Sequence, residues 1–456
     1  MKRAPKKRHS VWACSLMLTC CVSAQAKNEI RSSYQSNLAV ETQGGDAQKF
    51  EHILTPELVM DVNDNMRLFG QLRIRYDFSD ELEPTEPRDA SVRSGQSRRV
   101  FFGDDGELDL RELYVDGYLG SAFYRFGKQQ IVWGEADGLR VLDIINPFNF
   151  REFILSDSDD RRIPLWSANV EIPIHEWTAQ FLWVLDQTYD QTPERGVGAA
   201  FEFSSPRVVP ALPNNMANAS VIVNDPDKPD SVFADSDVGL RLTTFKNGWD
   251  ISLNYVYHYH DSQVLRREIR TTVAGKDNGE ADTTVIISPD YERTHLLGVT
   301  FSNAFGDITL RGEAAYSTDR FFITNDLLDS DGVIETPEFS SVLGLDYQGI
   351  RNVFLSGQIF TNYVLDHEEA MARDALETQF TFLYEHNFMN DRLKSSAQLI
   401  HSFNDADGLL QLGLAYEYRS NIQLSAGVDV FYGDEQGLFG QFKQNNRVTV
   451  GIEVGF

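Results

Sequence analysis

The sequence has little cysteine and a deficit of basic residues. Its three cysteines, Cys14, Cys20 and Cys21, all lie within the first 26 residues, so the remainder of the chain cannot form an internal disulfide. Asp and Glu number 68 against 41 Lys and Arg, which gives a formal net charge of −27. Phosphate backbones require a basic surface, so this balance excludes nucleic acid as a partner.

Long hydrophobic runs and catalytic signatures are also missing. After residue 26, no stretch approaches the roughly 20 apolar residues that a membrane-spanning helix needs. We find no Gly-rich phosphate loop and no metal-ligand spacing, so we expect no cofactor, no metal and no enzyme activity. His258 and His260 lie beside Asp261, but their position at a predicted strand end favours packing. A hydrolase that uses these histidines is a remote alternative.

The first 26 residues have the three parts of a secretory signal peptide. Residues 2–8 are mostly basic, residues 11–22 form a short apolar run, and Ala24-Gln25-Ala26 supplies small residues for cleavage. The sequence therefore predicts export, with a signal peptide over residues 1–26.

The C-terminus alternates between apolar and polar or glycine positions. Val448, Val450, Ile452, Val454 and Phe456 occupy every second position, which places them on one face of a strand. An unbroken apolar row that ends in a terminal aromatic resembles the assembly signal of bacterial outer-membrane barrels.

The same period of two recurs in residues 66–78, 308–317 and 422–432. In a soluble sandwich the apolar face would form the core, whereas in a membrane barrel it would contact lipid and the charged face would line a wet lumen. The signal peptide, the terminal Phe and the number of such segments favour the barrel.

Connection lengths indicate the topology. Short links near residues 120, 175–176, 246–248, 304–306, 349–350, 389–390 and 420–421 alternate with a second class of links, at about 80–106, 134–164, 187–235, 261–292, 319–337, 365–376, 404–407 and 434–444. The links of this second class are long and polar, except for the short link at 404–407. The pattern predicts an all-β transmembrane barrel over residues 66–456, with about 16 antiparallel strands, short periplasmic turns and long extracellular loops.

The start of the mature chain is less regular. Residues 27–65 are predicted to be a leader or arm, either periplasmic or lumenal. Two segments, Phe50 to Val62 and Gly196 to Phe203, could be further strands, which would raise the count to 18. A barrel of either size leaves an aqueous channel unless something plugs it.

A family resemblance follows from residues 126–147. FGKQQIVWGE at 126–135 is followed by Gly138 and then by VLDIINP at 141–147. This run resembles the proteobacterial outer-membrane family called domain of unknown function 1302 (DUF1302), and it is similar to segments of alginate-export-type porins. The resemblance implies a porin-like channel, in a family whose members are thought to pass apolar or aromatic nutrients.

The loop that follows this run is a candidate constriction. Gly134 and Gly138 permit a sharp departure from the wall, while Phe148, Phe150 and Phe153 need burial that a pore mouth does not offer. We therefore expect the loop to fold inward; the alternative is a loop packed on its neighbours above the barrel. The charged constriction candidates are Glu135, Asp137, Arg140, Asp143 and Arg151. Trp133 is expected at the lipid interface.

Charged residues on polar strand faces are the candidate pore lining. They are Arg67, Arg73, Arg75, Arg241, Arg311, Glu313, Arg419, Asp429 and Glu453. Opposed charges would screen solutes, although they could also simply hydrate the wall. The cluster of Arg67, Arg73 and Arg75 is the best candidate contact for an anionic group.

These observations predict an outer-membrane, porin-like channel of a Gram-negative bacterium. It would take up small molecules passively, such as organic acids or aromatic or lipidic nutrients. The expected partners are this solute, outer-membrane lipid, lipopolysaccharide and, during insertion, the barrel-assembly machinery. A structural or partner-binding barrel without transport is the alternative. Acidic loops could bind divalent cations such as calcium, or could simply be solvated.

Overall fold

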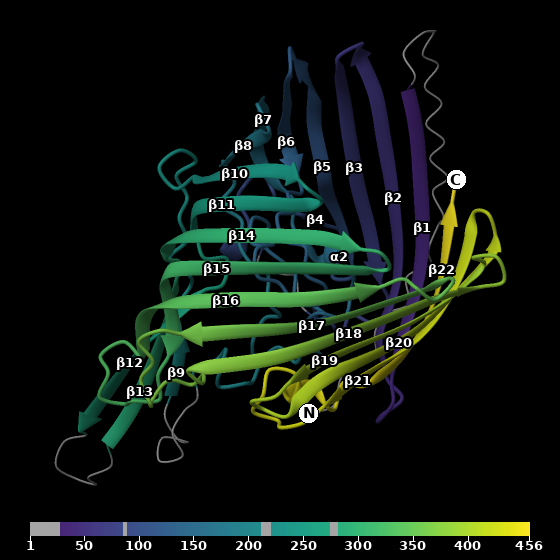
Figure 1. Cartoon of the computed structure of the whole chain (residues 1–456). Helices are drawn as coiled ribbons and strands as arrows, with labels where there is room; N and C mark the ends of the chain where they lie inside the picture. The colour runs from purple at the N-terminus through teal and green to yellow at the C-terminus, as the bar shows by residue number, and fades with distance from the viewer. Residues whose placement is uncertain (1–27, 85–88, 211–219, 274–280) are drawn as a thin grey trace.

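The computed structural model describes residues 28–84, 89–210, 220–273 and 281–456, so the predicted signal peptide lies outside the described residues. Within these ranges, eighteen strands form one closed antiparallel barrel (Figure 1). The wall strands are β1 (Asn28–Glu41), β2 (Ala47–Asn63), β3 (Met66–Asp77), β5 (Gly106–Leu119), β6 (Ala122–Gln129), β7 (Leu165–Ile174), β8 (Trp177–Val184), β10 (Asp237–Lys246), β11 (Trp249–Tyr259), β14 (Arg293–Phe305), β15 (Ile308–Ile323), β16 (Val333–Tyr347), β17 (Val353–Val364), β18 (Leu376–Phe388), β19 (Leu393–Ser402), β20 (Asp407–Arg419), β21 (Ile422–Tyr432) and β22 (Arg447–Gly455). The predicted fold class is confirmed.

The first and last strands close the barrel. β1 pairs antiparallel with β22, from Ser33 opposite Gly455 to Glu41 opposite Arg447. This pairing corrects two expectations: residues 28–63 belong to the wall rather than to a leader, and the wall has 18 strands rather than 16. In the sequence, serines interrupt the outward row of β1 and a proline interrupts that of β2, which hides their alternation. The segment 196–203 is not a strand but part of a loop.

The connections alternate between two ends of the barrel. The turn end carries the short links, such as residues 175–176 and 420–421, and the loop end carries the long ones. One further short link at the loop end, residues 42–46, joins β1 to β2 and keeps the alternation intact. The predicted pattern of short turns and long loops is therefore confirmed.

Small elements lie within the long connections. A three-stranded sheet of β12 (Val264–Val273), β13 (Ala281–Asp290) and β9 (Ser220–Val223) projects at the loop end (Figure 1). The other elements are β4 (Val100–Phe101), α1 (Asp89–Val92), α2 (Ser158–Arg161) and the 3₁₀ helix η2 (Gly440–Phe442). No helix among the described residues is long and apolar enough to span a membrane.

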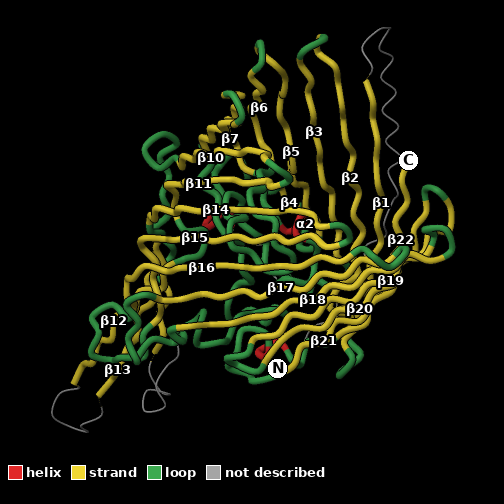
Figure 2. Tube along the Cα trace, viewed as in Figure 1, coloured by secondary structure: helices red, strands yellow, loops and turns green. Residues whose placement is uncertain are grey.

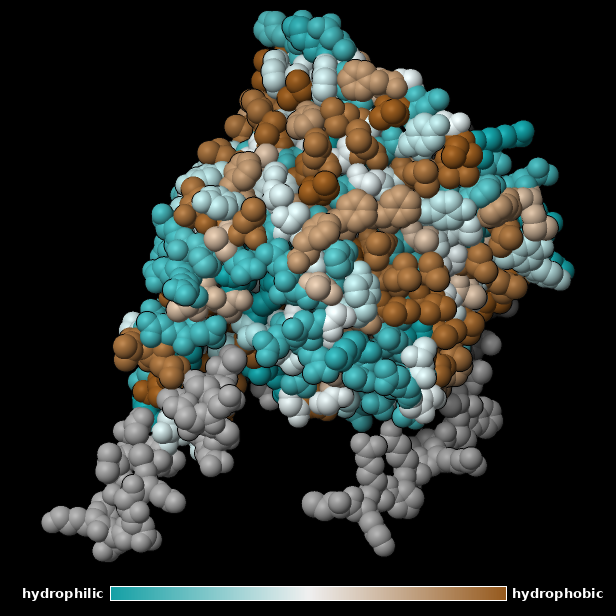
Figure 3. Space-filling model, turned by 60° about the horizontal axis from the view of Figure 1, so that its bottom comes forward, coloured by the Kyte–Doolittle hydropathy of each residue, from teal (hydrophilic) through white to brown (hydrophobic). Residues whose placement is uncertain are grey.

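The outer face of the wall is apolar. Large side chains such as Leu345 and Ile359 are more than half exposed there, and hydrophobic residues spread over the wall in the space-filling view (Figure 3). The C-terminal row belongs to this face, because Val448 and Val450 are 45% and 48% exposed and Phe456 is 70% exposed. An aqueous surface of this composition would be costly, whereas lipid accommodates it.

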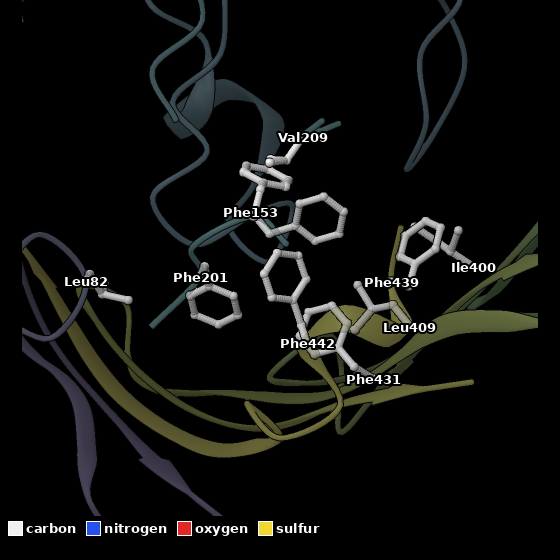
Figure 4. Packing of buried hydrophobic residues seen from close by; sticks show 10 residues of the cluster. Leu82, Phe153, Phe201, Val209, Ile400, Leu409, Phe431, Phe439 and Phe442 are labelled. Carbon is white, nitrogen blue, oxygen red and sulfur yellow. The ribbon is translucent and has the colours of Figure 1, made fainter. Parts of the chain in front are cut away.

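Long loops occupy the interior instead of leaving it open (Figure 2). Their aromatic side chains form a core of their own against the inner wall of β19, β20 and β21 (Figure 4). At its centre the ring of Phe153 lies 4.9 Å from that of Phe442, and both residues are almost fully buried. Phe431 of β21 supplies part of the wall side of this core, 5.6 Å from Phe442.

Candidate pore and solute-binding cavity

The connection between β6 and β7, residues 130–164, runs through the inside of the barrel; we call it the inward loop. Glycines of the wall allow its side chains to approach closely. A Cβ at Gly239 of β10 would lie 2.8 Å from the Trp133 ring, and a Cβ at Gly298 of β14 would overlap Leu142. Trp133 is 1% exposed and donates its indole N–H to Gln180. The prediction that Trp133 lies at the lipid interface is therefore wrong.

Two charged residues of β15 hold the first part of the inward loop. The carboxylate of Glu313 accepts three backbone N–H groups, from Glu135, from Ala136 at 2.8 Å and from Leu142 at 3.0 Å. Arg311 beside it donates to the carbonyl of Glu135 and pairs with Asp137. Thus two predicted lining residues and two predicted constriction residues meet at one point on the wall.

The other side of the inward loop reaches the opposite wall, where it is held by buried ion pairs. Arg151 pairs with Glu51 of β2, and Glu152 pairs with Lys49 of β2 at 2.9 Å and with Arg447 of β22 at 2.8 Å. Burial opposes the charge of Arg151, but the surrounding carboxylates, first of all Glu51, raise its pKa. The loop therefore crosses the barrel and is fixed at both sides.

Apolar residues on the inner face of the wall form the seat of this loop. They are Leu182, Val184, Val256, Leu296, Val342 and Phe360, which pack against the loop residues Ile131, Trp133, Val141, Leu142 and Ile145. Sequence reasoning missed them because it searched the inner face for charge. The signal in the sequence that could have revealed them is an apolar residue at an inward-facing position of a strand whose other inward-facing positions are polar. Val256 between Asn254 and His258 is an example.

A cavity of about 720 Å³ lies between the inward loop and the neighbouring loops at the loop end. One part of its lining is aromatic, with Phe150, Phe153, Phe203 and Phe439. Another part carries the guanidinium groups of Arg140, Arg161 and Arg162. This volume lies within the range of about 300–1,000 Å³ that is usual for small-molecule sites.

Phe148 connects the two parts of the cavity. The guanidinium carbons of Arg140 and Arg161 lie 4.2 Å and 4.9 Å from its ring centre, within cation–π range. Arg162 pairs with Asp143 at 2.6 Å. Burial, and then the charges of Arg140 and Arg162, lower the pKa of Arg161 to about 10. Burial and the two neighbouring cations therefore both disfavour the charged form of Arg161.

The remaining predicted lining residues fall into two groups. Arg67 pairs with Asp116 at 2.8 Å, Arg73 with Asp109 at 3.2 Å, Arg75 with Glu107 at 2.9 Å, and Asp429 with Arg447 at 2.8 Å. Because Arg67, Arg73 and Arg75 each already have a carboxylate partner, they are poorly placed to attract an anion together. Arg241 lies on the inner face of β10, whereas Arg419 and Glu453 are exposed at the turn end.

The five predicted constriction residues lie in two different places in the structure. Glu135 and Asp137 lie against β15, whereas Arg140 and Asp143 line the cavity with Arg151 at its edge. In the part of the chain that the structure describes, no group of three or more His, Cys, Asp or Glu residues could hold a metal ion.

Comparisons with known structures agree with this architecture. OccAB2 of Acinetobacter baumannii has a similar fold, with a TM-score of 0.52 and 10% identity over 94% of this chain and 98% of that chain. OccK3 (OpdO) of Pseudomonas aeruginosa gives a TM-score of 0.51 and 7% identity over 94% and 96% of the two chains. The fold is thus that of an outer-membrane, porin-like β-barrel.

The family is also established. The sequence profile described as "Protein of unknown function (DUF1302)" matches residues 36–456, so the chain belongs to this family. The resemblance of residues 126–147 to this family is confirmed. No curated protein sequence matches the chain.

Proposed function

We propose that this protein is a porin-like channel of the Gram-negative outer membrane, through which small molecules enter passively. The carrying observation is the inward loop, which crosses a barrel wide enough for an aqueous pore and is held at opposite walls by Glu313 and by Glu51. The cavity at the loop end gives a solute a place to enter beside this loop. The loop end faces the outside of the cell, and the turn end faces the periplasm.

The solute needs no chemical step to cross. It enters the cavity, loses part of its water shell against the aromatic lining, and moves past the loop by transient contacts. Charged groups such as Asp137, whose side chain is 41% exposed beside Arg311, line the narrowed section and set which solutes pass. The wall contacts outer-membrane lipid and lipopolysaccharide, and the C-terminal row would be read by the assembly machinery.

The experiment is a planar-bilayer recording with purified protein. We expect stepwise single-channel currents, and a larger conductance when residues 136–160 are replaced by a short Gly-Ser linker. An unchanged conductance in a folded deletion variant would show that the inward loop does not constrict the path.

A structural or partner-binding barrel is the second candidate. The specific observation in its favour is the density of buried ion pairs around Arg151, which fixes the interior firmly. This candidate predicts no current, and co-purification with a stoichiometric partner.

A further inference from the structure

The cavity has a polarity gradient that the channel proposal does not require. The ring centre of Phe148 lies 6.2 Å from that of Phe150, which in turn lies 6.4 Å from the ring centre of Phe203. Phe153 then lies 5.9 Å from Phe203. Of the described arginines that line the cavity, Arg140, Arg161 and Arg162 lie over the Phe148 ring, and Arg140 also lies 6.0 Å from the ring centre of Phe150. A ligand in the cavity would thus meet cations at one end and phenyl rings at the other.

The acidic residues of the cavity do not cancel this positive end. Glu83 and Asp89 pair with Arg99, at 3.3 Å and 2.6 Å. Asp143 pairs with Arg162, as described above. Three of the six carboxylates that line the cavity, Glu83, Asp89 and Asp143, are therefore engaged by cations of the protein itself.

Among the described residues, Asp190 is the only acidic residue within 4.0 Å of the guanidinium group of Arg140. It accepts the backbone N–H of Phe148 at 2.8 Å and the hydroxyl of Ser262 at 2.9 Å, and it lies 3.8 Å from Arg140. Its oxygens are thus shared among three donors, and its contact with Arg140 is the longest of the three.

Arg161 is different from the other cations at the site. Among the described residues, no carboxylate lies within 4.0 Å of its guanidinium group, which donates only to the carbonyl of Ser156 at 2.9 Å and to the hydroxyl of Ser158 at 3.2 Å. It is 7% exposed and belongs to the lining of the cavity. Asp157 and Asp143 act on Arg161 only from a longer range. A buried cation with no carboxylate in contact is costly, and an anion from solution would lower that cost.

We infer that the cavity binds an amphipathic organic anion, with its carboxylate at Arg161 and Arg140 and its aromatic or aliphatic body along Phe150, Phe153 and Phe203. This inference rests on the proposed channel function and names the class of solute. The phenyl row excludes water from the body of the ligand, while the planar guanidinium groups match the geometry of a carboxylate. A neutral molecule of the same shape would gain only the apolar part.

The test uses three probes that separate charge from apolar area. They are 6-phenylhexanoate, its neutral amide 6-phenylhexanamide, and hexanoate, which lacks the ring. Binding to the full chain in lipid nanodiscs is measured by calorimetry, with empty nanodiscs as the blank. We expect 6-phenylhexanoate to bind at least about 10-fold more tightly than either of the other two, because it alone uses both ends of the cavity.

Substitutions at the cationic end and at the aromatic end of the cavity test which part of the ligand each end binds. Arg161→Gln should weaken the acid by about 10-fold or more and leave the amide unchanged, whereas Arg161→Lys should retain part of the binding. Phe203→Ala should weaken the acid and the amide alike. Arg195→Gln is the matched control, since Arg195 lines the same cavity but is exposed and makes no cation–π contact with Phe148. Equal affinity for acid and amide, or equal effects of R161Q and R195Q, would overturn the inference.

Failure of the inference is distinguishable from failure of the channel. The same preparations are recorded in planar bilayers. Current without selective binding of 6-phenylhexanoate overturns the assigned solute class and leaves the channel standing. Selective binding without any current overturns the channel and supports the cavity as a binding site alone.

Discussion

The contact between Glu313 and the inward loop gives the sharpest local prediction. In Glu313→Ala, the backbone N–H groups of Glu135, Ala136 and Leu142 lose their common acceptor. Hydrogen bonds to charged groups contribute about 1.5–3 kcal/mol each, and water will replace part of this set in the opened loop. We therefore expect docking of the loop to weaken by about 3–6 kcal/mol.

A loss of about 3 kcal/mol, the lower limit of this range, would shift the equilibrium between the docked and the open loop by about 100-fold, since 1.4 kcal/mol corresponds to about 10-fold. Hydrogen exchange of the amides at 135, 136 and 142 measures that equilibrium directly. Glu313→Gln should have an intermediate effect, because one amide oxygen still accepts while the NH₂ group faces a donor.

Glu453→Ala serves as the control, since this carboxylate is exposed on β22 at the turn end, far along the wall from the inward loop. It should leave exchange in residues 135–142 unchanged. If Glu313→Ala also changes that exchange by less than about 2-fold, the carboxylate does not hold the loop and the reasoning is refuted.

Three further outcomes are expected. Gly298→Leu should expel the inward loop from its seat and raise single-channel conductance, while Gly357→Leu, whose added Cβ would meet only one side-chain atom at 3.9 Å, should not. Arg151→Ala should lower the free energy of unfolding by about 3–5 kcal/mol in urea titrations, because it leaves buried carboxylates unpaired, whereas Arg31→Ala, from an exposed pair, should change it by less than about 1 kcal/mol. Burial raises the pKa of Asp261 well above its usual range, and the charges of neighbouring carboxylates raise it further. The ionisation of Asp261 therefore costs stability as the pH rises from about 4 towards its folded-state pKa. Over this pH range the melting temperature of the wild type should fall relative to that of Asp261→Asn, and a difference that does not depend on pH would contradict this account.

Sequence periodicity predicted the wall because lipid and water impose opposite demands on alternate residues. It was least informative where a strand meets both demands weakly, as in β1, whose outward positions include Ser32 and Ser36. The predicted alternation of link lengths was correct because the length of a link depends on the end of the barrel at which it lies, and not on the number of strands.

The interior was predictable only in outline. The three phenylalanines at 148, 150 and 153 correctly indicated that the loop folds away from solvent, since Phe148 and Phe153 are each 3% exposed. Which wall residues meet the loop depends on contacts between segments far apart in the chain, such as Glu135 and Glu313. That no described carboxylate contacts the guanidinium group of Arg161 likewise depends on which carboxylates its neighbours engage, and no local pattern encodes that.

The most direct test of the central claim is chemical block of the current from inside the barrel. The only cysteines lie within the predicted signal peptide, residues 1–26, so we expect the mature chain to have no other thiol than one introduced in place of Asp137, whose side chain is 41% exposed on the inward loop. We predict that a charged methanethiosulfonate reagent reduces the current through Asp137→Cys and not through Ile359→Cys on the outer face of β17. Current that persists unchanged after complete labelling of Asp137→Cys would contradict a solute path past this loop.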